Sequence, residues 1–333
     1  MAYTDVEDII IPEIYLPYEY LKIIEKSKFF SGGIITPNAM ITEKLNGGGD
    51  MFKVPARILA QTAATALQSG TSIIPEAGTT AQANVRRCLL GKGWAEEELA
   101  SALAGSRPEF ELPELTAQFW ANEFEDWAIA GAKGIFANNI ADDSDLVNDI
   151  AAADGGAATD ANKVSADAII DTSMLLTDRI DAFEGGGIAM RSEVYTRLLK
   201  LNLIDFVPTA DQAFSIPTYQ TMAVVVDNSL PAVAAGDGYD YWTILYEKGS
   251  VGFGEGGYQF ITPIETDRTA ASGVDNLYMR KQFGFSFKGF SWATSDGIAN
   301  ETPTLAEYDD AANWTRVQDD ARTSGMALLV TSG

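Results

Sequence analysis

Apolar side chains recur at three- and four-residue steps between residues 113 and 139, a spacing that puts them on one face of an α-helix. Pro113 suits the first turn of such a helix, because a backbone N–H would have no helical partner there. Glu114 near the start and Lys133 near the end complement the helix dipole. We therefore predict a long amphipathic helix whose aromatic stripe belongs to a packed core rather than to a cofactor site. The stripe comprises Leu115, Phe119, Trp120, Phe124, Trp127 and Ile135.

Alternation and short apolar runs indicate strands in the second half of the chain. Phe283, Phe285 and Phe287 alternate with small or polar residues, which is typical of a sheet with one core face and one solvent face. Helices and strands follow no regular βαβ order, so the predicted fold class is α+β. The other predicted elements are strands over 188–190, 223–226 and 241–248, and a helix over 192–201 with Ser192 as its N-cap.

The first forty residues lack the pattern of a domain. Several isoleucines lie close to Pro12 and Pro17, and proline both removes a backbone donor and interrupts helices. An apolar segment of this kind cannot make a core of its own, so we expect it to need a partner surface. A short helix is predicted over 18–30, ended by Gly32 and Gly33.

Residues 41–87 show little helical period. A glycine-rich turn occupies 46–50, Phe52 and Val54 alternate with polar neighbours, and the run 61–70 is rich in Ala, Thr, Ser and Gln. A stretch of this length without clear structure is unusual inside a compact domain. Two interpretations remain open with equal weight: a projecting two-stranded loop, and a weakly patterned surface domain.

Residues 142–184 are the most acidic part of the chain, with 11 acidic and 2 basic side chains. The first half, 142–158, is predicted to be a loop. The second half is predicted to be a helix with an apolar stripe between Val164 and Phe183, ended by Gly185.

The composition narrows the classes of function. The whole chain has 333 residues, 46% of them hydrophobic, which suits a folded protein of about two domains. Its formal charge of −24 argues against a broad basic face for nucleic acid. The absence of histidine excludes Ser-His-Asp and Cys-His catalysis, and the single Cys88 excludes intrachain disulfides and thiolate zinc sites. We expect no membrane span and no secretory signal.

Two sequence features could suggest a ligand site. The run Gly252–Gly257 lacks the Lys-Ser/Thr of a phosphate loop, so a turn between strands is the preferred interpretation. An EF-hand loop that starts at Asp143 would need glycine at its sixth position and glutamate at its twelfth. The chain has Asn148 and Asp154 there, which favours a solvated acidic loop over a weak divalent-cation site.

Paired carboxylates give no positive support for an enzyme. Glu96 to Glu98, or Glu265 with Asp267, could do acid–base work only at a defined separation in a cleft. With 47 acidic side chains, such pairs arise by chance. We therefore predict a non-enzyme with no cofactor, no metal site and no catalytic residues.

A set of later segments carries a family resemblance when the segments are taken in order. They are Ile188–Tyr195, Val224–Pro231, Tyr246–Gly256, Glu265–Arg268, Arg280–Trp292, Thr302–Leu305 and Asn313–Trp314. This ordered set resembles the major capsid proteins of tailed bacteriophages, which have the Hong Kong 97-type fold. The resemblance extends from about Phe29 to the end of the chain. Many relatives have a histidine where this chain has Arg191, at a position that is structural in the family.

The resemblance implies a role for each segment. The expected division is an N-terminal arm over 1–40, an extended E-loop over 41–90, and a peripheral domain over 91–186 with its spine helix at 113–139. An axial domain follows over 187–262, and 263–333 would return to the peripheral domain, with 327–330 as a closing strand. Contacts between subunits would then come from the arm and the loop. The candidate contact residues are Ile9, Ile10, Ile11, Ile14, Phe52, Val54, Ile73 and Ile74.

The resemblance also implies a function. The chain would assemble with itself as pentamers and hexamers into an icosahedral virion shell, made in the host bacterial cytoplasm, without contact to a membrane. The shell would enclose double-stranded DNA without sequence-specific binding, and negative walls would avoid adhesion to that DNA. Scaffolding, portal and decoration proteins are the further partners implied. Lys44 and Lys53 lie in the expected loop, but we predict no covalent cross-link from either.

Two other functions remain as alternatives. An encapsulin-like compartment would share the fold and enclose protein cargo. A rival from another class is an acidic enzyme or carbohydrate-binding protein, which would need a cleft with convergent polar groups.

Overall fold

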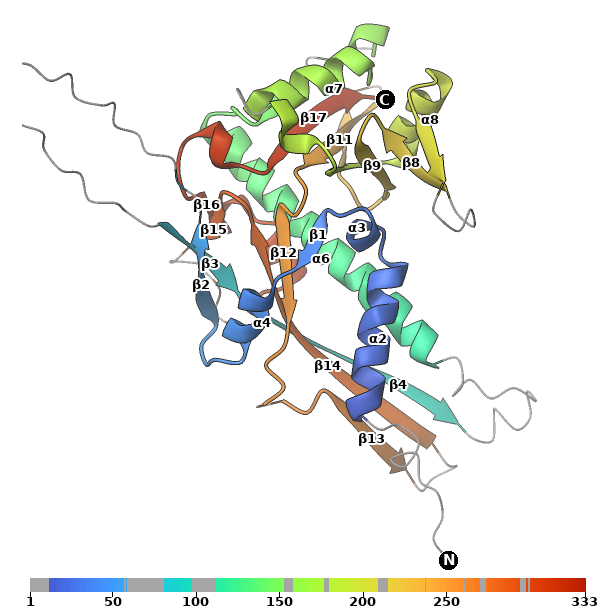
Figure 1. The fold of residues 1–333 in the computed structure, drawn as a ribbon, viewed down its shortest axis with the longest axis vertical. Coiled ribbons are helices and arrows are strands. Elements are labelled where there is room, and N and C mark those ends of the chain that lie inside the picture. Colours follow the sequence, from blue (N-terminus) through green and yellow to red (C-terminus); the bar gives the residue numbers. More distant parts are fainter. Residues whose placement is uncertain are drawn as a thin grey trace, which may run out of the picture.

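The computed structural model describes residues 12–56, 58, 81–97, 112–152, 158–176, 180–208, 215–236, 238–259, 261–269, 274–293, 298 and 300–333. One long helix, α6 (Leu112–Asp142), runs diagonally across the molecule (Figure 1). Its 31 residues span about 46 Å. The predicted helix over 113–139 is confirmed, and Trp120, Phe124, Trp127 and Ile135 of its stripe are buried. Leu115, in the first turn, is instead 55% exposed.

A five-stranded sheet packs against the N-terminal half of α6. Its order is β1 (Ile35–Pro37), β12 (Val251–Glu255), β14 (Val274–Phe287) and β13 (Ile264–Thr269), with β4 (Cys88–Glu97) paired to β14 on the other side. The predicted alternation places Phe283 and Phe285 of β14 toward the helix. The Phe124 ring centroid lies 4.9 Å from those of both Phe253 and Phe283.

The prediction that β14 has a solvent face is wrong for its second half. Gln282 is 2% exposed, and a Cβ placed on Gly284 would lie 3.2 Å from both Phe52 and Val85. The reason is that a small two-stranded ladder covers this face. The ladder joins β2 (Met51–Ala56) and β3 (Ala81–Arg86) in antiparallel register. Of the two interpretations of 41–87, the described part has the two strands of the first, but they lie on β14 and do not project from the body. A short helix, α4 (Ala39–Leu45), was not predicted and packs beside it.

An eight-stranded sheet lies at the other end of the molecule (Figure 1). The predicted strands near 188–190, 223–226, 241–248 and 327–330 are all present in it, and 192–201 is helical as predicted. Arg191, rather than Ser192, is the N-cap of that helix. The strands in order are β5 (Val147–Asp149), β17 (Met326–Ser332), β11 (Gly238–Tyr246), β6 (Gly187–Met190), β9 (Met222–Val226), β8 (Ser215–Tyr219) and β7 (Asp205–Pro208), with β10 (Ala232–Ala235) paired to β11. Helices α7 (Ala166–Ser173) and α8 (Ser192–Lys200) accompany this sheet.

The last strand corrects the expected division of the chain. β17 pairs with β11 over seven residues, so residues 326–332 lie in the sheet of the 187–262 segment and do not return to the other end with 263–316. Conversely, β12 at 251–255 belongs to the five-stranded sheet. Sequence order could not show this, because either sheet offers a buried position to an apolar strand.

The N-terminal segment is more structured than predicted. Helix α2 (Pro12–Lys26) passes through Pro17, and α3 (Lys28–Ser31) ends at Gly32. Ile23 and Phe29 are completely buried in the chain's own core. Residues from about 16 onward therefore belong to the body of the subunit. The predicted arm can include at most the residues before them.

A buried carboxylate fixes the junction between α2 and α3. Glu125 of α6 accepts hydrogen bonds from Ser27 Oγ and Lys28 N, both at 2.6 Å, and from Phe29 N at 3.3 Å. Burial raises the pKa of Glu125, while these three donors oppose that shift. The carboxylate thus accepts hydrogen bonds from backbone N–H groups in the first turn of α3, which have no acceptor within the helix.

Shorter elements complete the fold. In the acidic segment, the predicted loop contains β5, and the predicted single helix is divided into α7, η4 (Met174–Leu176) and η5 (Ile180–Phe183). A two-stranded sheet pairs β15 (Phe290–Trp292) with β16 (Trp314–Arg316). The remaining short helices are α9 (Leu305–Tyr308), η3 (Asp160–Asn162), η6 (Ala311–Asn313) and η7 (Ala321–Thr323).

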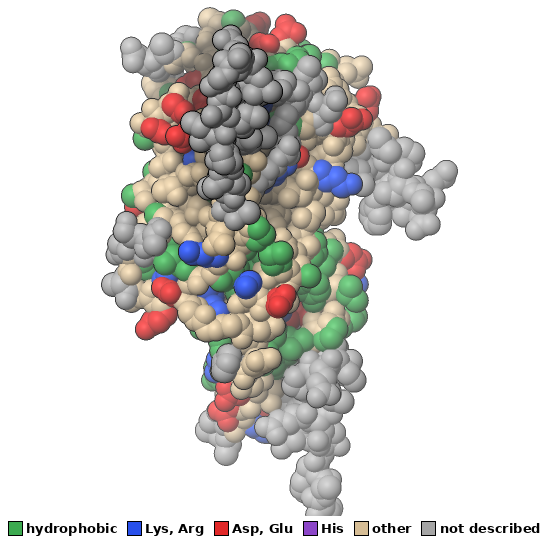
Figure 2. Space-filling view, turned by 60° about the vertical axis from the view of Figure 1, so that its left-hand side comes forward, with side chains coloured by type: hydrophobic (Ala, Val, Ile, Leu, Met, Phe, Trp, Pro, Cys, Tyr) green, Lys and Arg blue, Asp and Glu red, His purple; other side chains and the backbone are tan. Residues whose placement is uncertain are grey.

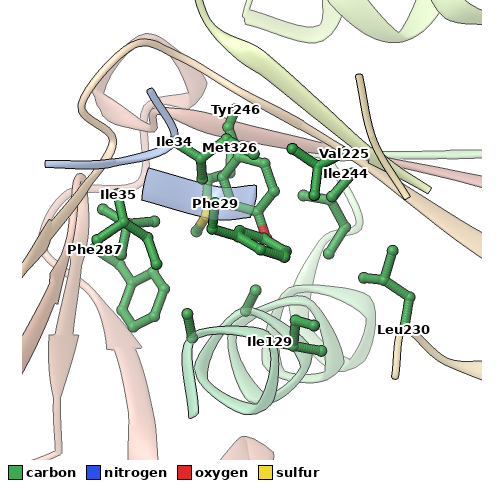
Figure 3. Packing of buried hydrophobic residues seen from close by; sticks show 14 of the residues in the cluster. Phe29, Ile34, Ile35, Ile129, Val225, Leu230, Ile244, Tyr246, Phe287 and Met326 are labelled. Carbon is green, nitrogen blue, oxygen red and sulfur yellow. The ribbon is translucent and has the colours of Figure 1, made fainter. Parts of the chain in front are cut away.

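The main core connects both sheets through the middle of the subunit. Figure 3 shows Phe29, Ile34 and Ile35 from the N-terminal segment beside Ile129 of α6, Tyr246 of β11 and Met326 of β17. Residues far apart in sequence therefore share one cluster. A second, smaller cluster contains Ile41, Leu45, Phe52, Val54 and Val85. We call it the satellite cluster.

Candidate intersubunit surfaces

The predicted contact residues fall into three groups in the structure. Phe52 and Val54 are 9% and 8% exposed within the satellite cluster, so their side chains have little area left for another subunit. Ile14 lies on α2, but its side chain is outside the described residues. Ile9, Ile10, Ile11, Ile73 and Ile74 also lie outside the described residues, so their contacts stay a prediction.

The β2–β3 ladder is attached to the body by a small set of polar contacts. Arg86, 2% exposed, pairs with Asp50 at 2.6 Å and donates to the carbonyl oxygen of Asn300 at 3.0 Å. Asn84 N donates to Ser291 Oγ at 2.9 Å, which connects β3 to β15. These contacts fix the direction in which the chain leaves the body at the ends of β2 and β3.

The first half of β14 extends beyond the body between two shorter partners. Residues 274–279 pair with β13 on one side and with β4 on the other. This three-stranded extension is braced on α6 by Trp94, whose ring meets that of Phe119 edge-on at 5.7 Å. Lys92 Nζ lies 5.3 Å from the centroid of the same Phe119 ring.

Large hydrophobic side chains are exposed at both ends of the molecule. Sequence patterns did not indicate that they would be exposed, because isolated apolar residues on amphipathic elements are common, and Leu115 was expected in the core stripe of its helix. Only their exposure in the folded chain identifies them as candidate contacts. At the end that carries the five-stranded sheet they are Tyr18, Leu21, Leu89, Leu115 and Tyr278. At the end that carries the eight-stranded sheet they include Ile170, Met174, Leu199, Leu201, Phe206, Val233 and Tyr239.

Arg191 holds a loop of the eight-stranded sheet. Its guanidinium donates to the carbonyl oxygens of Asn228 at 2.5 Å and Leu230 at 2.8 Å. It also lies over the ring of Tyr241, 5.9 Å from the centroid. These contacts assign Arg191 the structural role expected for its position.

Asp143 and Asp145, which were considered from the sequence as ligands of a divalent cation, bind side chains of the protein itself. Arg316 Nη1 lies 2.9 Å from Asp145 and 3.3 Å from Asp143, and Asn139 donates to both carboxylates at 2.9 Å. Within the described ranges, no group of three or more potential metal-ligating side chains occurs.

Two described features could be considered for chemistry, Cys88 and a recess beside α8. Cys88 is completely buried, and burial raises the pKa of its thiol far above the usual range. A recess of about 310 Å³ has Lys163, Glu193, Arg197 and Lys200 around it. Arg197 there already donates to the carbonyl oxygen of Val164 at 3.0 Å, and Glu193 pairs with Arg191 at 3.5 Å.

Charged side chains do not form a broad basic field on the face drawn in Figure 2. Lys and Arg lie there singly among acidic and hydrophobic side chains. Among the helices of the described residues, none is long and apolar enough to cross a membrane.

Comparisons with known proteins agree with the fold. No family model matches the chain. The major capsid protein of Bacillus phage SPP1 is 31% identical over 322 residues, which cover 96% of this chain and 95% of that protein. The capsid of Ralstonia phage GP4 has a TM-score of 0.58 at 10% identity and covers 92% of both chains. The capsid of cyanophage Pam1 has a TM-score of 0.54 at 10% identity and covers 93% of both.

The two structural likenesses show the fold alone, whereas the identity to the Bacillus phage SPP1 protein extends over nearly the full length of both chains. This confirms the resemblance found in the sequence and the α+β fold of the Hong Kong 97 type. The chain belongs to the family of major capsid proteins of tailed bacteriophages.

Proposed function

We propose that this chain is the repeating subunit of an icosahedral shell that encloses double-stranded DNA, and that it assembles as pentamers and hexamers. The observation that carries the proposal is the 31% identity to a major capsid protein over 96% of this chain. The role is structural, without catalysis. An encapsulin-like compartment and an acidic enzyme are not favoured, because the relatives are phage capsid proteins.

The two sheets belong to two domains that make different contacts in the shell. The eight-stranded sheet with α8 corresponds to an axial domain, which clusters around capsomer axes and now includes residues 326–332. The five-stranded sheet with α6 corresponds to a peripheral domain, whose extension of β4, β13 and β14 reaches outward. The exposed hydrophobic side chains at the two ends supply apolar area for contacts of these two kinds.

The charge suits a DNA container. A formal charge of −24 repels the DNA backbone, so the shell encloses DNA without holding a particular sequence. The subunit is made in the host bacterial cytoplasm and reaches the virion through assembly. Scaffolding, portal and decoration proteins are its further partners.

Electron microscopy of the purified full-length chain, expressed alone and with candidate scaffolding proteins, tests this function. Closed icosahedral particles with pentamers and hexamers support it. A monomer under all these conditions, or particles filled with protein cargo instead of DNA in infected cells, would contradict it.

A loop replacement tests the predicted E-loop. Residues 59–79 lie between β2 and β3, so a short Gly/Ser linker in their place leaves both strands and the satellite cluster intact. We expect a folded subunit that cannot close a stable shell, measured by circular dichroism and by electron microscopy. Normal shells from this variant would show that the loop is not an intersubunit contact.

A further inference from the structure

Three ionisable side chains from three elements meet in the interior beneath helix α2. Lys281 Nζ of β14 lies 3.0 Å from Glu19 Oε2 of α2 and 2.8 Å from Glu255 Oε1 of β12. The side chains of Lys281, Glu19 and Glu255 are only 1%, 0% and 8% exposed. Two carboxylates therefore share one ammonium group away from water.

The charges of this cluster do not balance. When all three groups are ionised, the cluster has a net charge of −1, and a buried charge without its own partner is costly. Glu255 receives a second donor, because the Tyr258 hydroxyl donates to its Oε1. The other polar groups that face Glu19 or its partners are Thr116 of α6 and Tyr20 of α2 itself. Lys281 is the one cation that acts on Glu19 among the described residues.

We propose that Glu19, Glu255 and Lys281 form a proton-controlled latch, in which uptake of one proton by Glu19 fastens helix α2 to the body of the subunit. Loss of that proton leaves the excess negative charge buried and loosens the helix. The latch is a property of the single subunit and goes beyond the proposed shell function.

The direction of the effect follows from the environment of each group. Burial raises the pKa of Glu19, and the Glu255 carboxylate adds to this, although Lys281 opposes it. Burial alone would lower the pKa of Lys281, but the two carboxylates outweigh it, so the ammonium stays charged. In a detached helix, the pKa of Glu19 would return to its ordinary value of 4.5. Attachment therefore binds a proton, and it strengthens as the pH falls through the raised pKa of Glu19 toward 4.5.

The other described contacts of α2 contain no comparable buried charge. Leu16, Tyr20 and Ile24 pack against the main core beside Ile23. Ile23 is completely buried, but Tyr18 and Leu21 are 48% and 66% exposed. Lys22 pairs with Glu25 of the same helix, and Lys26 reaches Glu114 of α6 only at 3.9 Å. Such exposed pairs contribute little to stability. Apolar packing therefore holds α2 in both states, and the buried contact of Glu19 with Lys281 adds the part that depends on the proton.

Hydrogen–deuterium exchange of the unassembled full-length chain tests the latch between pH 5 and 8. Peptides from α2 are compared with peptides from the middle of α6, so that the intrinsic pH dependence of exchange cancels. In the wild type we expect opening of α2 to decrease as the pH falls, by at most about tenfold per pH unit because one proton is bound. A flat response, or an increase in opening at low pH, would overturn the proposal.

Three variants identify the group that responds. Glu19→Gln mimics the protonated carboxyl, so its α2 should open rarely at every pH. Glu255→Gln leaves Lys281 to Glu19 alone, so the pH response should move to lower pH, and this variant decides the question if Glu19→Gln does not fold. Glu265→Gln is the matched control, because Glu265 forms an exposed pair at 2.9 Å with Arg280, the neighbour of Lys281. A wild-type slope in Glu19→Gln would refute the latch.

Discussion

The main core and the satellite cluster are both apolar, but they are held together in different ways. The main core joins α6, both sheets and the N-terminal segment. As one example, the ring centroid of Phe253 lies within 5.3 Å of the centroids of Phe30, Phe124 and Phe285. The satellite cluster has five members from α4, β2 and β3. It is thus a thin layer on the outer face of the five-stranded sheet.

This difference has a consequence for motion and assembly. Local unfolding requires little free energy where few apolar contacts are lost. We therefore expect the satellite cluster to open more readily than the main core. It lies at the base from which the chain between β2 and β3 departs. If residues 59–79 form the proposed E-loop, we expect that loop to adjust to a neighbour while the main core keeps its fold.

The largest expected effect is in the main core. Phe253→Ala removes a completely buried ring and leaves a cavity among aromatic neighbours, so we expect the free energy of unfolding to fall by about 3–5 kcal/mol. Chemical denaturation of the unassembled subunit, followed by tryptophan fluorescence, measures this. An unchanged denaturation midpoint would show that the main core does not control stability.

A smaller and more local effect is expected in the satellite cluster. Phe52→Ala should cost about 2–3 kcal/mol, because Phe52 is 9% exposed and its edge position can partly collapse. Amide exchange should increase in β2 and β3 and stay unchanged in α6. Equal increases in both places would mean that the two clusters unfold together.

The sequence predicted the main core better than the satellite cluster, for physical reasons. The stripe of α6 and the alternation at Phe283, Phe285 and Phe287 repeat over several turns or residue pairs, so their periodicity is clear. Helix α4 has seven residues and only Ile41 and Leu45 buried, which is too short to show a period. The covered outer face of β14 could not be inferred, because Gln282 and Gly284 are themselves typical of a solvent face.

The candidate surfaces were less predictable than the fold. The contact candidates were chosen because they are apolar in segments without a core, and two of them, Phe52 and Val54, proved to be buried in their own chain. The sequence could not show that residues 51–54 fold back onto β14. Likewise, Glu19 and Lys281 look like surface charges in the sequence, and only the crossing of α2 over β14 buries them.

The packing of α4 provides a test of intermediate size. A Cβ on Gly254 would lie 2.6 Å from Ile41 Cγ2 and 2.7 Å from Thr42 N, so Gly254→Ala must displace α4 from β12. We expect a loss of about 1–2 kcal/mol and faster amide exchange in α4. Gly48→Ala is the matched control, because a Cβ there meets nothing within 4 Å. Similar exchange in both variants would contradict this packing.

The smallest effect is expected from the ion pair at the base of the ladder. The hydrogen bond from Arg86 holds the pKa of Asp50 below its ordinary value of 3.8, so the pair stabilises the ladder at neutral pH and loses this contribution as the pH falls below about 4. Asp50 is 58% exposed, and Arg86 keeps the carbonyl oxygen of Asn300 as a partner, so Asp50→Asn should cost less than about 1 kcal/mol. Exchange in β2 and β3 should differ between wild type and variant at pH 7, and the difference should decrease as the pH falls below about 4. A difference that persists or grows in acid would show that Asp50 acts on the ladder other than through its charge.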